Sequence, residues 1–313
     1  MPTFATQYTL LKNTTRAHLA LLGTNIFFAI NYTAIKWLVG KHIIQPFGLN
    51  LVRVGVTAML LWSMRLFDPA KGNFTKKEYG RLALCALTGI AINQLLFVKG
   101  LSLTYSIHAS LLMLTTPILI TVIAAWLLKE MLTGMKLAGL ALGIIGAAIL
   151  VSARPSGGHA DNVLLGDILI IINAVSYTFY FVLVKPLMAR YDPVVVIRML
   201  FTFGFFLILP FCLTEFTEIQ WSAFQPMDYL VLFLIVVPGT FLAYIFNVYG
   251  IKVLGASLAG TYIYSQPVFA ASIAMMFLGE KLDLYKFFAA CCIGAGVYLS
   301  NRASTTKVSA ITE

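Results

Sequence analysis

The chain carries two copies of one segment, and this internal repeat limits the possible fold more than any other feature. Residues 89–146 align without a gap with residues 239–296 at a constant offset of 150, and 12 of the 58 positions are identical. The identical pairs include Gly89 and Gly239, Gly100 and Gly250, Pro117 and Pro267, and Glu130 and Glu280. The two halves are therefore expected to share one fold.

The composition places this repeat in a membrane. Hydrophobic residues make up 60% of the chain and charged residues only 11%, whereas a soluble domain has roughly 25% charged residues. A spanning helix needs about 20 mostly apolar residues. Ten such windows occur, at about 17–38, 47–67, 80–99, 105–128, 134–152, 164–184, 194–213, 228–249, 256–278 and 284–301.

The windows divide into five per half, and five is an odd number. After five crossings the chain is on the other side of the membrane, so the second copy must run with inverted topology. The sequence predicts an all-α integral membrane protein with ten transmembrane helices as two inverted five-helix repeats, 17–152 and 164–301. Inverted repeats are typical of secondary transporters, whose binding site lies near the midplane.

The distribution of Lys and Arg predicts the orientation. With the N-terminus inside, fourteen of these residues fall on inner segments and six on outer segments. Both termini are therefore expected to be cytoplasmic, in an inner membrane of the bacterial type. The polar tail 302–313 is expected to be cytoplasmic and without regular structure.

Several classes of function find no support. The net charge of +10 does not indicate a nucleic-acid partner, because the basic residues flank the membrane windows. No cofactor motif, phosphate-binding loop, HExxH or nucleophile elbow is present, which disfavours a membrane enzyme. The cysteines lie at apolar helical positions without the spacing of a metal or disulfide site, and they are Cys85, Cys212, Cys291 and Cys292.

One run of residues recurs in both halves. In the first half it comprises Asn-Tyr-Thr-Ala-Ile-Lys at 31–36, then Pro46 and Arg53. In the second half it comprises Ser-Tyr-Thr-Phe-Tyr at 176–180, then Lys185, Pro193 and Arg198. The closing part has Pro267, Leu-Gly-Glu at 278–280, Gly294 and Gly296. Over about 17–301 the chain resembles the EamA-type transporters of the drug/metabolite transporter superfamily.

The resemblance implies export of an amino acid or a related metabolite. Phe28 and Tyr177 stand where the family pattern commonly has tryptophan, and Lys129 replaces the glycine before Glu130. These departures leave the identity of the substrate open.

Polar residues inside the windows are candidates for the substrate site. Such residues are costly in a membrane and usually face an interior cavity, although hydrogen bonds between helices are the alternative. An aromatic cavity with amide and hydroxyl groups suits a small amphipathic solute better than a bare ion. The predicted substrate-binding residues are Asn31, Asn93, Gln94, Tyr177, Tyr180, Tyr244, Asn247, Tyr262 and Gln266.

Two prolines are predicted to be hinges. Pro117 and Pro267 fall in the middle of predicted helices at equivalent points of the two copies. A mid-helix proline removes one hydrogen bond and kinks the helix. The alternative is a fixed kink that only improves packing.

Four charged residues within or directly beside the windows are candidates for a structural or a substrate-binding role, namely Lys36, Arg53, Lys185 and Arg198. The two arginines are expected to snorkel to an interface or to pair with a helix end, and contact with a substrate carboxylate is the alternative. Asp167 and His108 have no partner at helical spacing. Proton coupling, exchange and facilitated diffusion thus all stay possible.

The predicted function is a secondary transporter that moves a small organic metabolite across the inner membrane by alternating access, without a cofactor. The predicted partners are a small-molecule substrate and the lipid bilayer, with protons as an option, and the predicted state is a monomer or weak homodimer. A channel or scramblase, or a drug efflux protein, is the alternative.

Overall fold

The computed structural model describes residues 4–66, 74–116, 118–119, 123, 134–151, 160–254 and 262–309. Every regular element within these ranges is a helix. Six helices are long and apolar enough to cross a membrane, namely Thr14–Val39, Pro46–Leu66, Lys76–Leu103, Val163–Arg190, Pro193–Thr217 and Pro226–Leu254. Shorter apolar helices cover Leu137–Leu150, Ile263–Leu278 and Leu284–Gly296. The predicted all-helical character is confirmed for this part of the chain.

The helices of the first half are α1 (Phe4–Val39), α2 (Pro46–Ser63), α3 (Lys76–Ala86), α4 (Asn93–Leu103), α5 (Ser106–Met113) and α7 (Gly134–Val151). Those of the second half are α8 (Val163–Arg190), α9 (Pro193–Thr217), α10 (Pro226–Val236), α11 (Ala243–Leu254), α13 (Gln266–Leu278) and α14 (Leu284–Ser309). Short 3₁₀ turns are η1 (Met64–Leu66), η3 (Trp221–Ala223) and η5 (Ile263–Ser265).

Local sequence signals explain where the helices begin and end. Thr75 and Glu78 form a capping box at the start of α3, so two backbone N–H groups of the first turn are bonded. Asp192 caps α9 through the N–H of Val194. Gly279 ends α13 with φ of 64°, a conformation that glycine adopts without steric cost.

Two sequence-based expectations about this fold are wrong. The tail 302–313 was expected to lack regular structure, but α14 continues to Ser309. A long membrane helix supplies the nucleus that a short polar segment lacks, so the helix extends beyond the apolar window. Pro267 does not interrupt a continuous α-helix, because it lies in the first turn of α13, directly after η5. A proline at that position leaves no hydrogen bond broken.

Two π-helical segments occur at equivalent places in the halves. They are η2 (Leu87–Ile92), between α3 and α4, and η4 (Val237–Leu242), between α10 and α11, and their offset is 150. A Cβ atom on Gly89 of η2 would lie 2.5 Å from the ring of Tyr180, and one on Gly239 of η4 would lie 2.9 Å from Cγ of Asn31. Both segments therefore require glycine where a side chain of the other half packs on them.

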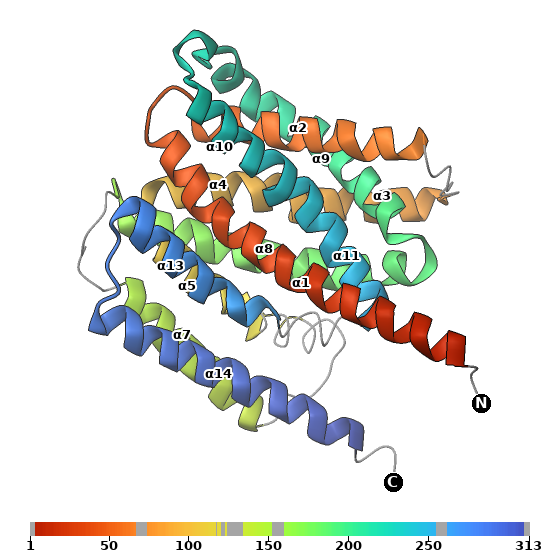
Figure 1. Ribbon diagram of the computed structural model, residues 1–313. Helices are drawn as coiled ribbons and strands as arrows, with labels where there is room; N and C mark the ends of the chain where they lie inside the picture. Colours follow the sequence, from red (N-terminus) through yellow and green to blue (C-terminus); the bar gives the residue numbers. More distant parts are fainter. Residues whose placement is uncertain are drawn as a thin grey trace.

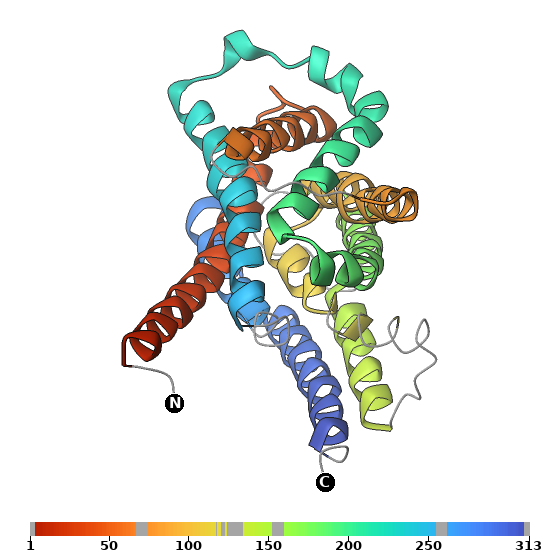
Figure 2. The same cartoon turned by 90° about the vertical axis from the view of Figure 1, so that its right-hand side faces the viewer.

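The packing of the helices follows the repeat. α2 packs on α9 and α7 on α14, and each of these contacts joins corresponding helices of the halves. α5 also packs on α13. α4 packs on α8 in the same way as α11 packs on α1. Figure 1 shows α7 and α14 side by side along one flank of the bundle, and Figure 2 shows the same pair from another direction. Both termini lie at the same end of the bundle (Figure 1).

Candidate functional site

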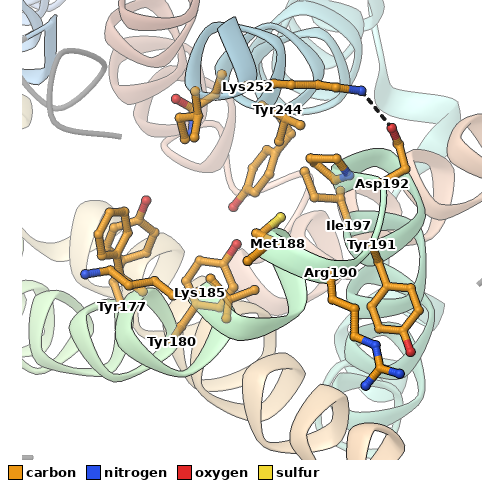
Figure 3. Close-up of a pocket in the computed structure, with 17 residues that line it drawn as sticks. Tyr177, Tyr180, Lys185, Met188, Arg190, Tyr191, Asp192, Ile197, Tyr244 and Lys252 are labelled. Carbon is orange, nitrogen blue, oxygen red and sulfur yellow. Dashed lines mark hydrogen bonds and ion pairs between the residues drawn. The ribbon is translucent and has the colours of Figure 1, made fainter. Parts of the chain in front are cut away.

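A polar cavity of about 120 Å³, which we call the chamber, lies within the bundle. Its walls come from α1, α2, α4, α5, α8, α11 and α13, together with Thr116 and η5. A larger cavity of about 690 Å³, the vestibule, lies between α8 and α11 (Figure 3). Tyr177, Tyr244 and Asn247 line both cavities, so the vestibule and the chamber are adjacent.

Helix α8 extends along the vestibule and the chamber and continues beyond the chamber. Lys185 lines the vestibule, Asn173 lines the chamber, and Asp167 lies fully buried beyond it. At a rise of 1.5 Å per residue, Asn173 is about 9 Å from Asp167 and about 18 Å from Lys185 along the helix axis. The vestibule thus lies toward the Lys185 end of α8, and the buried Asp167 lies toward the other end.

Arg53 brings a positive charge to the chamber wall. Its side chain is 3% exposed, and Nε donates a hydrogen bond of 2.7 Å to the hydroxyl of Thr240 in η4. Thr240 in turn donates to the carbonyl of Ile235, 2.8 Å away. One terminal nitrogen of the guanidinium, Nη1, is buried and has no hydrogen-bond partner. The expectation that Arg53 snorkels to an interface is therefore wrong, because its side chain is buried and bonded to η4.

Amide side chains supply free acceptors to the same chamber. The Nδ2 atoms of Asn25, Asn31 and Asn173 donate to the backbone carbonyls of Leu21, Gly239 and Asn93 at 2.7, 2.9 and 2.6 Å. A carbonyl only accepts, so each amide must direct its nitrogen at the backbone. The three Oδ1 atoms are buried without a hydrogen-bond partner, as is Oε1 of Gln94.

Aromatic rings form much of the remaining wall. Tyr244 meets Phe28 edge-on at 6.2 Å, and Tyr32 meets Phe97 edge-on at 5.3 Å. The hydroxyl of Tyr244 accepts a hydrogen bond of 3.0 Å from Nε2 of Gln94. No acidic side chain lines the chamber among the described residues. The chamber thus combines one cation, several acceptor oxygens and aromatic faces.

The mouth of the vestibule carries paired charges. Lys252 of α11 lies 3.0 Å from Asp192, as the dashed line in Figure 3 shows, and Arg190 lies 2.8 Å from Glu78. Partial burial raises the pKa of Asp192, but hydrogen bonds from Lys252 and the N–H of Val194 outweigh it, so the net pKa is lower than usual. The Lys252 pair therefore remains charged at neutral pH.

A buried polar cluster, which we call the seal, closes the other end. Lys36 of α1 donates to the carbonyl of Thr104, and the Thr104 hydroxyl donates to Oδ1 of Asp167. Nδ1 of His108 lies 3.0 Å from Oδ2 of Asp167. Glu280 accepts hydrogen bonds from the N–H groups of Ser106 and Ile107, at 2.7 and 2.9 Å, and so caps α5. The seal is completed by Tyr105 and Lys286.

Most of the predicted substrate residues come together. Seven of the nine line the chamber, namely Asn31, Asn93, Gln94, Tyr177, Tyr244, Asn247 and Gln266. Tyr180 lines the vestibule instead. Tyr262 lies outside both cavities, and its hydroxyl is 2.6 Å from Nδ1 of His18.

Sequence reasoning missed further chamber residues, which are Thr24, Asn25, Phe28, Tyr32, Phe97, Met113, Thr116, Asn173 and Ile263. One signal was available for Asn173. It stands one helical turn before Tyr177 on the face of α8 that was already predicted to line a cavity.

The charged candidates and hinges occupy different places. Arg53 lines the chamber, Lys185 lines the vestibule and Lys36 belongs to the seal. Arg198 is buried, contrary to the snorkelling expectation, and its guanidinium lies over the ring of Trp62 at 5.6 Å. Pro117 lies outside the described residues. The hinge role of Pro267 stays a prediction.

Proteins of similar sequence are transporters by name. An uncharacterized transporter of Archaeoglobus fulgidus is 25% identical over 286 residues, which are 91% of this chain and 97% of the relative. The uncharacterized transporter YetK of Bacillus subtilis is 25% identical over 80% of this chain and 75% of its own. A probable terminal-alkyne amino-acid exporter of Streptantibioticus cattleyicolor is 27% identical over 90% of this chain and 92% of its own.

The fold and the family agree with these relatives. A solved crystal structure matches with a TM-score of 0.59 at 18% identity, over 91% of this chain and 96% of that chain, which indicates a shared fold. The profile of the EamA-like transporter family matches residues 15–152 and 164–302. The chain is therefore a multi-pass membrane transporter, not an enzyme, and it belongs to the EamA-like transporter family.

Proposed function

We propose that this chain is a ten-helix transporter of two inverted five-helix repeats that exports an amino acid or a closely related small solute by alternating access. The repeats correspond to 17–152 and 164–301. The chain lies in the inner membrane with both termini cytoplasmic. The chamber binds the solute, and the vestibule and the seal mark the two ends of its path.

Contacts exchanged between the halves support the two-repeat architecture. Thr24 and Asn173 are equivalent at an offset of 149, and each donates to a backbone carbonyl of the other half, namely Ala243 and Asn93. Leu21 and Ile170 are equivalent in the same way and pack against Gly250 and Gly100. One pattern of contacts thus occurs twice.

The observation that carries the substrate class is the free guanidinium nitrogen of Arg53 in a chamber with free amide oxygens. A carboxylate bound there gains a charge-assisted hydrogen bond. An ammonium group donates three hydrogen bonds, and the Oδ1 atoms of Asn25, Asn31 and Asn173 are acceptors without donors. The chamber therefore complements a zwitterion. The relative that is named a probable amino-acid exporter agrees with this class.

The vestibule at one end of α8 and the buried seal at the other end support alternating access and export. Lys185, Arg190 and Lys252 lie at the vestibule end, and an excess of basic residues marks the cytoplasmic side. The vestibule then faces the cytoplasm, where an exporter loads. A channel or scramblase needs a continuous path, and the buried seal interrupts it. A broad drug efflux site favours a more apolar wall than these amides provide.

A transport assay with a matched arginine pair tests the proposal. Purified protein in proteoliposomes is screened with amino acids and with the amines that lack their carboxylate. Arg53→Gln is expected to weaken binding of the preferred amino acid roughly 30- to 1,000-fold, because losing one partner of a buried charge pair costs about 2 to 4 kcal/mol. Binding of the amine should change little.

Arg198→Gln is the control. Arg198 occupies the equivalent place in the second half but lies over Trp62, outside the chamber. This variant should keep the preference for the amino acid over its amine. Equal losses in both variants, or no transport of any zwitterion by the parent, would exclude the proposed site.

A further inference from the structure

The seal contains a titratable pair from two helices. His108 of α5 and Asp167 of α8 are 59 residues apart in sequence, and their side chains are 1% and 0% exposed. The hydroxyl of Thr104 donates to one carboxylate oxygen of Asp167, and Nδ1 of His108 lies 3.0 Å from the other. An ionised carboxylate only accepts, so the shared proton lies on Nδ1 of the imidazole.

The second nitrogen of His108 determines which charge state fits. Nε2 is buried and has no hydrogen-bond partner among the described residues. On a neutral imidazole with its proton on Nδ1, this atom carries only a lone pair. On an imidazolium it carries a charged N–H, and leaving such a donor buried and unpaired costs more free energy. The closed seal therefore accommodates the neutral ring.

Cations already surround this position. The ring of Tyr105 lies 5.3 Å from the ring of His108, between centroids. The Nζ atoms of Lys36 from α1 and Lys286 from α14 lie 5.6 and 5.0 Å from the centre of the same Tyr105 ring. A protonated His108 would be a third cation around one aromatic ring.

The anions of the seal do not offset a third cation. Among the residues that the structure describes, the buried carboxylates of the seal are Asp167 of α8 and Glu280 after α13, which balance the two buried lysines. Asp283 is 25% exposed and Asp161 is exposed, so water and salt screen both groups. A proton on Nε2 of His108 thus leaves one unbalanced positive charge in a dry cluster.

We infer that His108 is a proton-binding site that makes the seal acid-sensitive: a proton taken from water on the seal side and bound at Nε2 opens this end of the protein. The inference rests on the proposed alternating-access function and adds a signal that controls one of its two gates. Opening exposes Nε2 to water, so the open form binds the proton more tightly. Acid then shifts the population toward the open form, by at most about tenfold per pH unit for one proton.

Distances between two spin labels test the gate without cargo. Cysteines replace Leu164, three residues before Asp167 in α8, and Leu282, two residues after Glu280, and both leucine side chains are exposed. Cys291 and Cys292 are replaced by alanine, whereas Cys85 and Cys212 are buried. In lipid nanodiscs, the population at the longer label distance should increase between about pH 8 and pH 5.

His108→Asn is the decisive variant. Asparagine keeps an amide donor near the position of Nδ1 but has no second nitrogen that can bind a proton, so the short distance should persist at every pH. His42→Asn is the matched control, because His42 is exposed at the same end and its φ of 58° suits asparagine. It should respond to acid like the parent.

Asp167→Asn offers a second test. It leaves two buried lysines facing one buried carboxylate, so the longer distance should already be populated at about pH 8. A parent whose distance does not change with pH, or an equal acid response in His108→Asn, overturns the inference. If the protein transports solute but the distance between the labels does not change with pH, only the acid-sensitive seal is refuted. If the distance responds to acid but no solute is transported, only the exporter function is refuted.

Discussion

At the scale of single residues, the chamber owes its chemistry to amides whose nitrogens are held by the backbone. Asn31 and Asn173 each bond a carbonyl of the other half, so the Oδ1 atom is turned away from that carbonyl. A leucine at either position would fill similar space but remove both the bond between the halves and the acceptor. One side chain thus serves both packing and binding.

Two tyrosines allow packing and substrate binding to be tested separately. Tyr244 and Tyr262 each hydrogen-bond through the hydroxyl, but only Tyr244 lines the chamber. We expect Tyr244→Phe to weaken substrate binding roughly fivefold, since one hydrogen bond contributes about 1 kcal/mol. Tyr262→Phe should lower thermal stability by a similar free energy and leave affinity unchanged. Calorimetric titration measures substrate affinity and thermal unfolding measures stability. Reduced affinity in Tyr262→Phe would contradict the assignment of the chamber as the binding site.

At the scale of elements, the two π-helical segments join the halves. Each has a glycine under a side chain of the other half, Gly89 under Tyr180 and Gly239 under Asn31. Thr240 in η4 also accepts a hydrogen bond from Arg53, whereas Ile90, at the equivalent position of η2, has no hydroxyl. The segments therefore share a backbone shape but differ in chemistry.

Substituting the glycine tests this contact. Gly89→Ala places a Cβ atom 2.5 Å from a buried ring, so we expect a loss of about 1 to 3 kcal/mol in unfolding free energy. Gly80→Ala is the control, because no atom lies within 4 Å of its Cβ position and alanine favours a helix by up to about 1 kcal/mol. Thermal unfolding in detergent measures both. Equal stability of the two variants would show that Tyr180 moves away without cost.

At the scale of the whole molecule, the vestibule and the seal lie at opposite ends of the path. The chain exposes many large apolar side chains on its outer surface, including Phe206, Phe211, Met276 and Phe277. Such a surface is stable in lipid and not in water. The proposed orientation places the vestibule end of the bundle on the cytoplasmic side.

Cysteine labelling of intact cells tests the proposed orientation. Lys76 at the start of α3 and Lys281 after α13 are both exposed lysines near opposite ends. With Cys291 and Cys292 replaced, Lys281→Cys should react with a membrane-impermeant maleimide, and Lys76→Cys should react only after permeabilisation. The reverse pattern would invert the topology and turn the proposed exporter into an importer.

The chamber was predictable from the sequence because a membrane makes polar residues conspicuous. Asn93 and Gln94 stood out within an apolar window and indeed line it. Tyr262 did not fit, because it lies before η5 and its hydroxyl meets Nδ1 of His18 in α1.

Other features had no local signal. His108 and Asp167 meet only because α5 packs on α8, and no spacing within one helix reveals such a pair. The π-helical segments depend on tertiary packing over a single glycine. Sequence periodicity assigns faces within one helix, whereas contacts between helices need the assembled bundle.

The exchange of side chains between equivalent positions has a consequence for kinetics. Tyr177 corresponds to Phe28 and Tyr180 to Asn31 at an offset of 149, so equivalent positions of the two halves differ in polarity. Tyr180 lines the vestibule and Tyr177 lines both cavities, whereas Phe28 and Asn31 line only the chamber. A solute that enters through the vestibule therefore passes two phenols without a counterpart at the equivalent positions of the first half, and half-saturation should require different concentrations on the two sides of the membrane.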